Sequence, residues 1–413
     1  MNCLEKDNIP VGYKDSTVGI IPQEWEVKRL GTIAKCFSGG TPKSESEEMY
    51  GGTIPFIRSG EIHGDKTALY LTDDGLRKSS AKIVDVGDLI FALYGANSGD
   101  CAISQINGAI NQAILCIRSS SVINSFLQPY LELQKDRFIA KYLQGGQGNL
   151  SGEIVSSYTI PVPPLAEQRK IAEILGVWDE AIEKQSRLIE KLELRKRALM
   201  QHLLTGRTRL PGFTTPWQKV KLGEICKRVT RRNEGNNQNV MTISAQKGFV
   251  SQTDFFNKSV ASSTLDNYYL VLKDEFCYNK SYSNGYPMGA IKRLKEADKA
   301  VVTTLYICFS ITDKQKLSID FFEQYCENGE FNQGLMKIAN EGGRAHGLLN
   351  VTPTDFFSLV MLLPTLPEQK AIAEVLTTAD NEIATHRKKL DALRLQKRGL
   401  MQQLLTGKTR VKI

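Results

Sequence analysis

The stretch LLTGKTR at residues 404–410 holds the Gly-Lys-Thr ending of a phosphate-binding loop, and such a loop would bind a nucleotide. The first glycine of that motif, G-x-x-x-x-G-K-[ST], would have to stand at position 402, where the chain has Gln402. A near copy, LLTGRTR, occurs at residues 203–209, and both copies close a helical pattern. We therefore interpret the string as a helix ending and not as a nucleotide site.

Other residue patterns also fail to supply a set of reacting groups. Asp85, Asp88 and Asp274 stand near predicted strands, where carboxylates are usually solvated turn residues. The sequence lacks N-P-P-Y and D-P-P-Y, a G-x-G-x-x-G that opens a helix, and the H-x-E with C-x-x-C of deaminases. We therefore predict a protein without catalytic residues of its own.

Metal binding and disulfide bonds have no support in the sequence either. The 8 cysteines are scattered and form no C-x-x-C pair, so we expect them to be reduced. The 4 histidines lack the spacing of metal ligands, and they are His63, His202, His346 and His386. We expect no metal ion.

Length and charge limit the class of protein. A chain of 413 residues exceeds one ordinary core, so two or more domains are expected. The net charge of +8 points weakly towards nucleic acid. No apolar run approaches the roughly 20 residues of a membrane-spanning helix, and the start MNCLEKDNIPVGYKDS has charges of both signs and no apolar stretch. We expect a cytoplasmic protein.

Two long helical patterns repeat at an offset of 201 residues. Residues 163–210 align with residues 364–411 without a gap, and about half of the positions are identical. Apolar residues follow a heptad pattern in both copies. The apolar positions are Ile171, Leu175, Trp178, Ile182, Ile189, Leu192, Leu199 and Leu203 in the first copy, and Ile372, Leu376, Ala379, Ile383, Leu390, Leu393, Leu400 and Leu404 in the second.

Each pattern predicts a helix of about 60 Å, which needs a partner along its length. Polar residues interrupt the two stripes at equivalent positions, which favours pairing of the two helices with each other; these residues are Gln185, Lys196, His386 and Lys397. The alternative is that the two amphipathic helices lie on separate cores. Thr365 and Glu368 have the spacing of a capping box, and Gly206 and Gly407 are expected just past the helix ends.

The segments before the two helices also resemble each other. WEVKRLGTIAK from Trp25 matches WQKVKLGEICK from Trp217, and Asn149 and Asn350 stand at equivalent positions near the two ends. Short β-branched and aromatic runs, such as DLIFALYG and AVVTTLYICFSI, predict mostly β structure with some helix. We predict an α+β chain with an N-terminal extension at 1–21, a domain at 22–160, a long helix at 161–208, a domain at 209–360 and a long helix at 361–413.

Polar, glycine-bearing loops recur in both predicted domains, while the rest of the two middles differs strongly. Arg and Lys suit guanine, Asn and Gln suit adenine, and Ser and Thr suit several bases, so we interpret these loops as DNA-binding. The alternative is that they are ordinary solvated loops. The candidate DNA-binding residues are Thr41, Lys43, Arg58, Ser59, Tyr94, Asn97, Ser98, Asn111, Gln112, Arg231, Arg232, Asn233, Ser244, Gln246, Lys247, Asn279, Lys280 and Tyr282.

These motifs resemble those of one known family. SGGTPKSESEEMYGGTIPFIRSGEI, GAINQAI, the P-x-P-P-L-A-E-Q helix start and the duplicated LLTG are similar to the specificity subunit of Type I restriction-modification enzymes, from about residue 18 to the end. One departure is Pro164, which stands where the second helix has Thr365 and removes an N-cap hydroxyl.

The resemblance implies two target recognition domains with pseudo-twofold symmetry, held apart by an antiparallel coiled coil. It implies that each domain reads one half of a bipartite target in double-stranded DNA, and unlike domains imply an asymmetric target. It also implies two modification (methyltransferase) subunits and restriction (helicase-nuclease) subunits as partners. S-adenosylmethionine, ATP and Mg are expected on those partners and no cofactor on this chain. The other interpretation of the residues is a coiled-coil scaffold that presents two protein-binding β domains.

Overall fold

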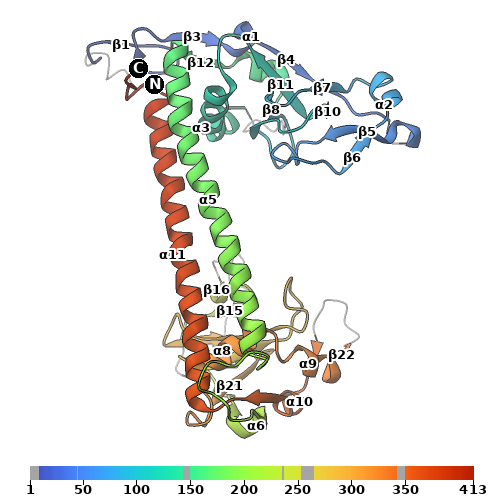
Figure 1. Cartoon of the computed structure of the whole chain (residues 1–413), viewed down its shortest axis with the longest axis vertical. Coiled ribbons are helices and arrows are strands. Elements are labelled where there is room, and N and C mark those ends of the chain that lie inside the picture. Colours follow the sequence, from blue (N-terminus) through green and yellow to red (C-terminus); the bar gives the residue numbers. More distant parts are fainter. Residues whose placement is uncertain (1–8, 44, 143–148, 235–236, 253–264, 342–348) are drawn as a thin grey trace. The chain divides into compact units, whose positions relative to one another are not determined.

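The computed structural model describes residues 9–43, 45–142, 149–234, 237–252, 265–341 and 349–413. The chain forms two compact units, each of which takes in part of both long helices (Figure 1). Unit 1 comprises Met1–Ser186 with Lys388–Ile413, and unit 2 comprises Arg187–Arg387. We call the β-rich part of unit 1 domain 1 and that of unit 2 domain 2.

Domain 1 contains two four-stranded sheets. The first has the antiparallel order β4-β11-β8-β9, and the second has the order β6-β5-β10-β7, in which β5 and β10 are parallel. The strands are β4 (Ala34–Ser38), β5 (Tyr50–Ile57), β6 (Leu69–Leu71), β7 (Lys82–Val84), β8 (Leu89–Ala92), β9 (Cys101–Ile103), β10 (Gly108–Ile110) and β11 (Ile114–Ser119). Around them lie β1 (Tyr13–Lys14), β2 (Ile21–Pro22), β3 (Glu26–Arg29), α1 (Leu30–Ile33), the 3₁₀ helix η1 (Glu47–Met49), α2 (Asp73–Arg77), α3 (Asn124–Tyr142), α4 (Gly152–Ser157) and β12 (Thr159–Val162).

Domain 2 repeats the first of these sheets in the order β14-β21-β18-β19. Its strands and short helices are β13 (Gln218–Lys221), α6 (Leu222–Ile225), β14 (Cys226–Arg228), β15 (Met241–Ser244), β16 (Gly248–Ser251), β17 (Tyr269–Leu272), β18 (Phe276–Asn279), β19 (Ala290–Arg293), β20 (Lys299–Val302), β21 (Ile307–Ile311), α8 (Ile319–Glu327), α9 (Asn332–Ile338), β22 (Asn340–Glu341), β23 (Leu349–Asn350), α10 (Pro353–Phe357) and β24 (Val360–Leu363). Mostly β structure with some helix is therefore confirmed in both domains.

The central strands are apolar because both of their faces are buried. In β8, Leu89 and Phe91 join one hydrophobic cluster while Ile90 and Ala92 join another on the opposite face. The side chains of β18 alternate in the same way, since Phe276 and Tyr278 lie in one cluster and Cys277 lies in a second. A strand between two cores reads as a continuous apolar run, which is why these runs were recognisable in the sequence.

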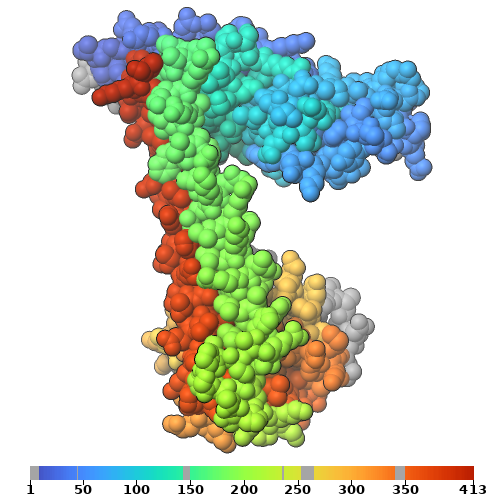
Figure 2. All heavy atoms as spheres, viewed as in Figure 1, coloured from blue at the N-terminus to red at the C-terminus, as the bar shows by residue number. Residues whose placement is uncertain are grey.

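The two long helices pair with each other within each unit. They are α5 (Leu165–Leu203) and α11 (Leu366–Leu404), and their atoms pack closely in Figure 2. In unit 1 Lys397 Nζ lies 2.6 Å from Asp179 Oδ1, and in unit 2 Lys196 Nζ lies 2.6 Å from Asp380 Oδ1. The two predicted lysine interruptions are therefore ion pairs between the helices.

The pairing is antiparallel, because in unit 1 Asp179 of α5 meets Lys397 while the earlier residue Glu167 meets the later residue Arg410. The ends of the helices also belong to the domain cores. Ile171 and Leu404 lie in the core of unit 1, and Ile372 lies in that of unit 2. The two helices thus pair with each other, and their ends also pack on the cores of the two units.

The helix endings follow the prediction, but the capping box does not. Gly206 and Gly407 follow the last helical turns with φ of 71° and 73°, the left-handed region that glycine enters without strain. Glu368 does not cap its own helix, because its carboxylate accepts hydrogen bonds from Arg209 and from Trp217 Nε1. The capping-box interpretation of Glu368 was therefore wrong.

This carboxylate instead joins the start of one helix to the tail that follows the other. In unit 2 Arg209 binds Glu368 through Nε and Nη2, and Glu368 is completely buried. In unit 1 Arg410 binds the equally buried Glu167, which also accepts from Trp25 Nε1 at 2.8 Å. We call these two clusters the arginine locks. They explain why the TG-x-TR tail occurs twice.

Candidate nucleic-acid interface

Three loops of domain 1 meet at one edge of the second sheet. They follow β5, β8 and β10 and comprise residues 58–68, 93–100 and 111–113, which we call rim 1. Since β5 and β10 are parallel, their carboxyl ends lie at the same edge. The loop after β8 is tied to this edge by a hydrogen bond from Asn97 Nδ2 to Ser59 O at 3.3 Å. Candidates from separate parts of the sequence are thus brought together.

A fourth loop, residues 39–43, lies directly against strand β10. A Cβ atom on Gly39 would fall 1.8 Å from Ile110 O, so only glycine allows this approach. Tyr50 OH donates to Pro42 O at 2.9 Å and fixes the far side of the loop. As a result Thr41 Oγ1 donates to Gln112 Oε1 at 2.5 Å, which adds Thr41 to rim 1.

Some candidates in domain 1 are occupied by contacts within the domain. Arg58 binds Glu61 through Nε and Nη2, each at 3.1 Å, and these hydrogen bonds lower the pKa of Glu61 to about 2. Ser98 is buried and donates to Leu93 O. Tyr94 is half-buried and forms a β-bridge with Asn149, while Lys43 is exposed. These contacts assign Arg58 and Ser98 to holding the rim.

Domain 2 has an equivalent edge, rim 2, formed by residues 244–247, 280–289 and 303–305, which lie at the end of β15 and after β15, β18 and β20. Asn279 Nδ2 donates to Ile243 O at 3.1 Å, and Gln246 Nε2 donates to Asn284 O at 3.0 Å. Both domains therefore use a side-chain amide to tie the loop after the central strand to the neighbouring sheet edge.

The remaining candidates of rim 2 differ in exposure. Ser244 is buried and accepts from Lys247 N, whereas the side chain of Lys247 is exposed. Lys280 is half-buried, and burial, together with the charge of Arg228, lowers its pKa. Tyr282 is 64% exposed. Lys247 and Tyr282, like Gln246, are thus exposed predicted residues of rim 2.

The basic loop of domain 2 is partly committed to the fold. Asn233 is completely buried and binds Asn237 through both its amide nitrogen and its amide oxygen, so it presents no surface to DNA. Arg231 makes two hydrogen bonds of 3.2 Å to Glu275. Arg232 donates to Asn267 O and lies over the ring of Tyr269 at 5.2 Å. The prediction that Asn233 contacts DNA is not supported by this geometry.

Replacement of the two arginines by alanine is expected to have separate effects. Arg232→Ala should flatten the slope of log binding constant against log salt by roughly 0.9 if it contacts a phosphate. Arg231→Ala should mainly destabilise domain 2 by about 1–3 kcal/mol, because it leaves the buried Glu275 without its arginine and with only the backbone N–H of Leu272. DNA binding across a salt series, with urea unfolding of each variant, measures both. Unchanged binding and slope for Arg232→Ala would make it an ordinary surface residue.

The carboxylates considered in the sequence are structural. Arg118 binds Asp88 through Nε at 2.9 Å and reaches Asp85 through Nη2 at 2.8 Å. Arg293 binds Asp274, whose φ is 70°. Asp88 is buried, so its prediction as a solvated turn residue was wrong. Within the described residues no group of three or more His, Cys, Asp or Glu side chains could hold a metal ion.

Two glutamines that directly follow the locked glutamates hold the domains on the helices. Gln168 Nε2 donates to Pro163 O, and its Oε1 accepts from Ile123 N at 3.0 Å. Gln369 repeats this with Pro364 O and Ser318 N, at 2.9 and 2.8 Å. The sequence interpretation missed both residues, although their signal was present in the identical Glu-Gln pair of the two copies.

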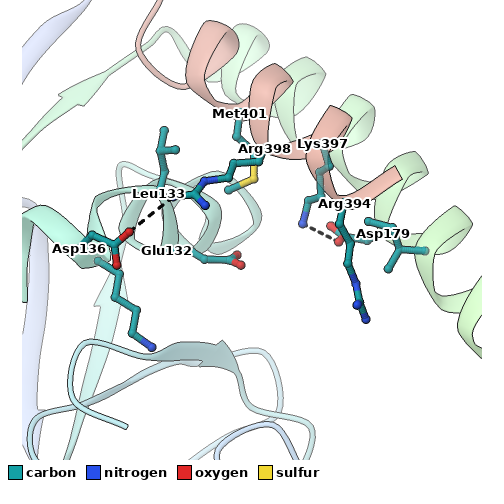
Figure 3. A pocket seen from close by; sticks show the side chains of 10 residues that line it. Glu132, Leu133, Asp136, Asp179, Arg394, Lys397, Arg398 and Met401 are labelled. Carbon is teal, nitrogen blue, oxygen red and sulfur yellow. Dashed lines mark hydrogen bonds and ion pairs between the residues drawn. The ribbon is translucent and has the colours of Figure 1, made fainter. Parts of the chain in front are cut away.

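A groove of about 480 Å³ lies between α3 and the helix pair in unit 1. Figure 3 shows Glu132, Leu133 and Asp136 facing Arg394, Lys397, Arg398 and Met401, with Arg398 Nη2 3.5 Å from Asp136 Oδ2. A second groove, of about 280 Å³, lies in unit 2 beside the equivalent pair Lys196–Asp380. It is lined by Gln324, whose buried Oε1 has no hydrogen-bond partner among the described residues. Each unit therefore carries a polar groove beside its own Asp–Lys ion pair between the two helices.

The comparisons with known proteins agree on one class of protein. Residues 22–194 match the Type I restriction modification DNA specificity domain. The fold is shared with the crystal structure of a Type I restriction-modification system S subunit from M. genitalium, at a TM-score of 0.54 and 16% identity, over 92% of this chain and 96% of that one. A chain from a structure on complex assembly and conformational transition of the type I system gives a TM-score of 0.57 at 16% identity, over 94% and 99%.

Two relatives match over almost the full length and a third over less than half of it. The MjaVIII specificity subunit of Methanocaldococcus jannaschii is 23% identical over 95% of this chain and 94% of its own length. The putative MjaX specificity subunit of the same organism is 26% identical over 97% of both chains. The EcoR124I/EcoR124II specificity subunit of Escherichia coli is 25% identical over 40% of this chain and 44% of its own length. The predicted resemblance to Type I specificity subunits is confirmed, as is the predicted architecture of two domains and paired helices.

Proposed function

We propose that this chain is the DNA-reading subunit of a Type I restriction-modification complex, and that it has no catalytic activity of its own. Each domain reads one half of a bipartite target with its rim, and partner subunits methylate adenine or cleave the DNA. The similarity to specificity subunits supports the class of protein. No helix in the described part of the chain is long and apolar enough to cross a membrane, and we place the complex in the cytoplasm.

The observation that carries this proposal is one sheet edge built twice with different side chains. Both rims follow equivalent strands and are tied by a side-chain amide, yet rim 1 presents Asn111 and Gln112 where rim 2 presents Thr303 and Thr304. Base edges in the major groove differ in donors and acceptors, so unlike side chains on a common frame select unlike sequences. The target is therefore asymmetric.

The repeated contacts also support two copies of one partner. Each unit has its own arginine lock and its own groove beside an Asp–Lys pair. Two modification subunits that carry S-adenosylmethionine fit a surface presented twice. Restriction subunits, with ATP and Mg, complete the nuclease.

The test combines the purified chain with its modification subunit and maps methylated adenines on genomic DNA. We expect one consensus with two specific parts and an unspecified gap between them. Methylation without a consensus, or no methylation above that of the modification subunit alone, would contradict the proposal. Binding of a protein ligand by the domains with no DNA binding would favour the coiled-coil scaffold instead.

The proposal further predicts that the helices set the length of the gap. Ser186 and Arg387 are equivalent positions at the limits of the two units, so four residues inserted after each leave the pairing inside both units unchanged. Four residues add about 6 Å of helix, and DNA rises about 3.4 Å per base pair, so the gap should grow by one or two base pairs.

The consensus of the active double-insertion complex measures this effect, and both specific parts should stay the same. Insertion after Ser186 alone is the control, because it shifts one helix against the other and should lower stability. An active double-insertion complex with the original gap would show that another part of the assembly sets the distance.

A further inference from the structure

The amides of Asn111 and Gln112 at the end of β10 each have one side already occupied. Gln112 Oε1 accepts from the hydroxyl of Thr41, and Asn111 Oδ1 accepts from Ala113 N at 3.1 Å. In the described part of domain 1 neither amide nitrogen has a hydrogen-bond partner. Gln112 is exposed and Asn111 is half-buried. In these orientations the two amide nitrogens remain as donors, while each amide oxygen already accepts one hydrogen bond.

The environment keeps these orientations fixed. Thr41 cannot move away from Gln112 easily, because the Gly39–Gly40 loop is wedged against Ile110 O and Ser80 and because Pro42 O is held by Tyr50. The bond from Ala113 N is a local side-chain to backbone turn, which sets the Asn111 side chain relative to its own strand end. A glutamine that is free to turn offers a donor and an acceptor together, which is the pattern that binds adenine. The Thr41 bond occupies one of the two lone pairs of the Gln112 oxygen and so favours the orientation in which the amide nitrogen is the open group.

Domain 2 has the same local turn with different chemistry. Thr303 Oγ1 accepts from Leu305 N at 3.3 Å, as Asn111 Oδ1 accepts from Ala113 N. Thr304, the counterpart of Gln112, is exposed. The two residues that follow the strand therefore have the same backbone setting in both domains, but their side chains differ.

We propose that Asn111 and Gln112 read a guanine in the half of the target recognised by domain 1, and that Thr41 determines this choice by holding the Gln112 amide. Guanine is the base that presents two acceptors, O6 and N7, in the major groove, so it matches two neighbouring donors. Adenine and cytosine present an amino group there, which would meet a second donor. Gln112 touches the base, whereas Thr41 acts through Gln112 as a positioning residue. This inference rests on the proposed function.

The experiment uses the full chain assembled with its modification subunits and compares methylation of DNA libraries randomised across the target. Gln112→Ala should reduce the preference for guanine at one position about 10- to 100-fold, with the other positions unchanged. Gln112→Glu, which only accepts, should reverse the preference at that position towards a base with an amino group. Thr41→Val keeps the shape and removes the hydroxyl, so adenine should become accepted beside guanine.

Gln23→Ala is the matched control, since Gln23 is an exposed glutamine of unit 1 that lies outside rim 1. Three results would overturn the inference: a consensus that is unchanged in all three variants, a responding position that is not guanine in the original target, or a uniform loss at every sequence. The last result would assign the amide to a phosphate contact. If the complex with the original sequence gave no consensus at all, the proposed function would fail as well. A failure of the inference alone is thereby distinguished from a failure of the proposed function.

Discussion

Exchange of residues 22–160 for the corresponding domain of a related specificity subunit is expected to change one half of the recognised sequence completely and to leave the other half as it was. The reason is that rim 1 lies entirely within this segment, and rim 2 lies within residues 244–305. Each rim is tied by hydrogen bonds inside its own domain. Methylation mapping of the chimeric complex measures the result.

The structure shows which contacts the chimera must keep. Trp25 donates to Glu167, and Gln168 binds Ile123 N and Ser121 O, so the new domain must offer the same indole and the same backbone groups to the helix. The reciprocal exchange of residues 209–360 is the control and should change the other half. A chimera with changes in both halves would mean that the two domains read DNA jointly, and the predicted boundaries would have to move.

Loss of an arginine lock should have the largest effect on stability. Arg209→Ala leaves the buried carboxylate of Glu368 with only the indole of Trp217, so the free energy of unfolding should fall well beyond the effect of losing an exposed arginine. Arg410→Ala should act in the same way on Glu167 in unit 1. Urea unfolding, followed by hydrogen exchange of the segments around Trp25 and Trp217, measures which unit is weakened.

Two variants make this result specific. Arg207→Ala removes an exposed arginine from the same tail and should change the free energy of unfolding by less than about 0.5 kcal/mol. Replacement of both Arg209 and Glu368 by methionine removes the buried charge together with its partner and should cost less than Arg209→Ala alone. An effect of Arg209→Ala no larger than that of Arg207→Ala would show that the lock is not needed for stability.

The repeat determines much of the fold. Local patterns of residue type predict the two helices of 39 residues, their glycine endings and the apolar strands. They do so because periodicity and backbone preference act over a few neighbouring positions. The lysine interruptions at Lys196 and Lys397 were also visible. Their partners Asp380 and Asp179 were not, since each lies far away in the chain.

The sequence indicated which loops form the candidate site, but not what each of their polar side chains does. Glycine-rich polar loops of the sequence form the rims, yet by residue type alone Asn233, Arg58 and Gln112 were equal candidates. Only the tertiary structure separates them, because it buries Asn233, pairs Arg58 with Glu61 and leaves one side of the Gln112 amide open. Hydrogen-bond partners of this kind come from distant strands and loops, so the folding of the whole domain decides them.

The sequence by itself therefore determined the two repeats, the long helices, the kind of side chains on the loops and the resemblance to Type I specificity subunits. The tertiary structure decided what each polar side chain does. It turned the expected cap Glu368 into a lock with Arg209, and it fixed Thr41 on Gln112 through the close approach of Gly39 to Ile110. The physical reason is that residue type sets which bonds a side chain can form, while burial and neighbours in space set which of them it forms.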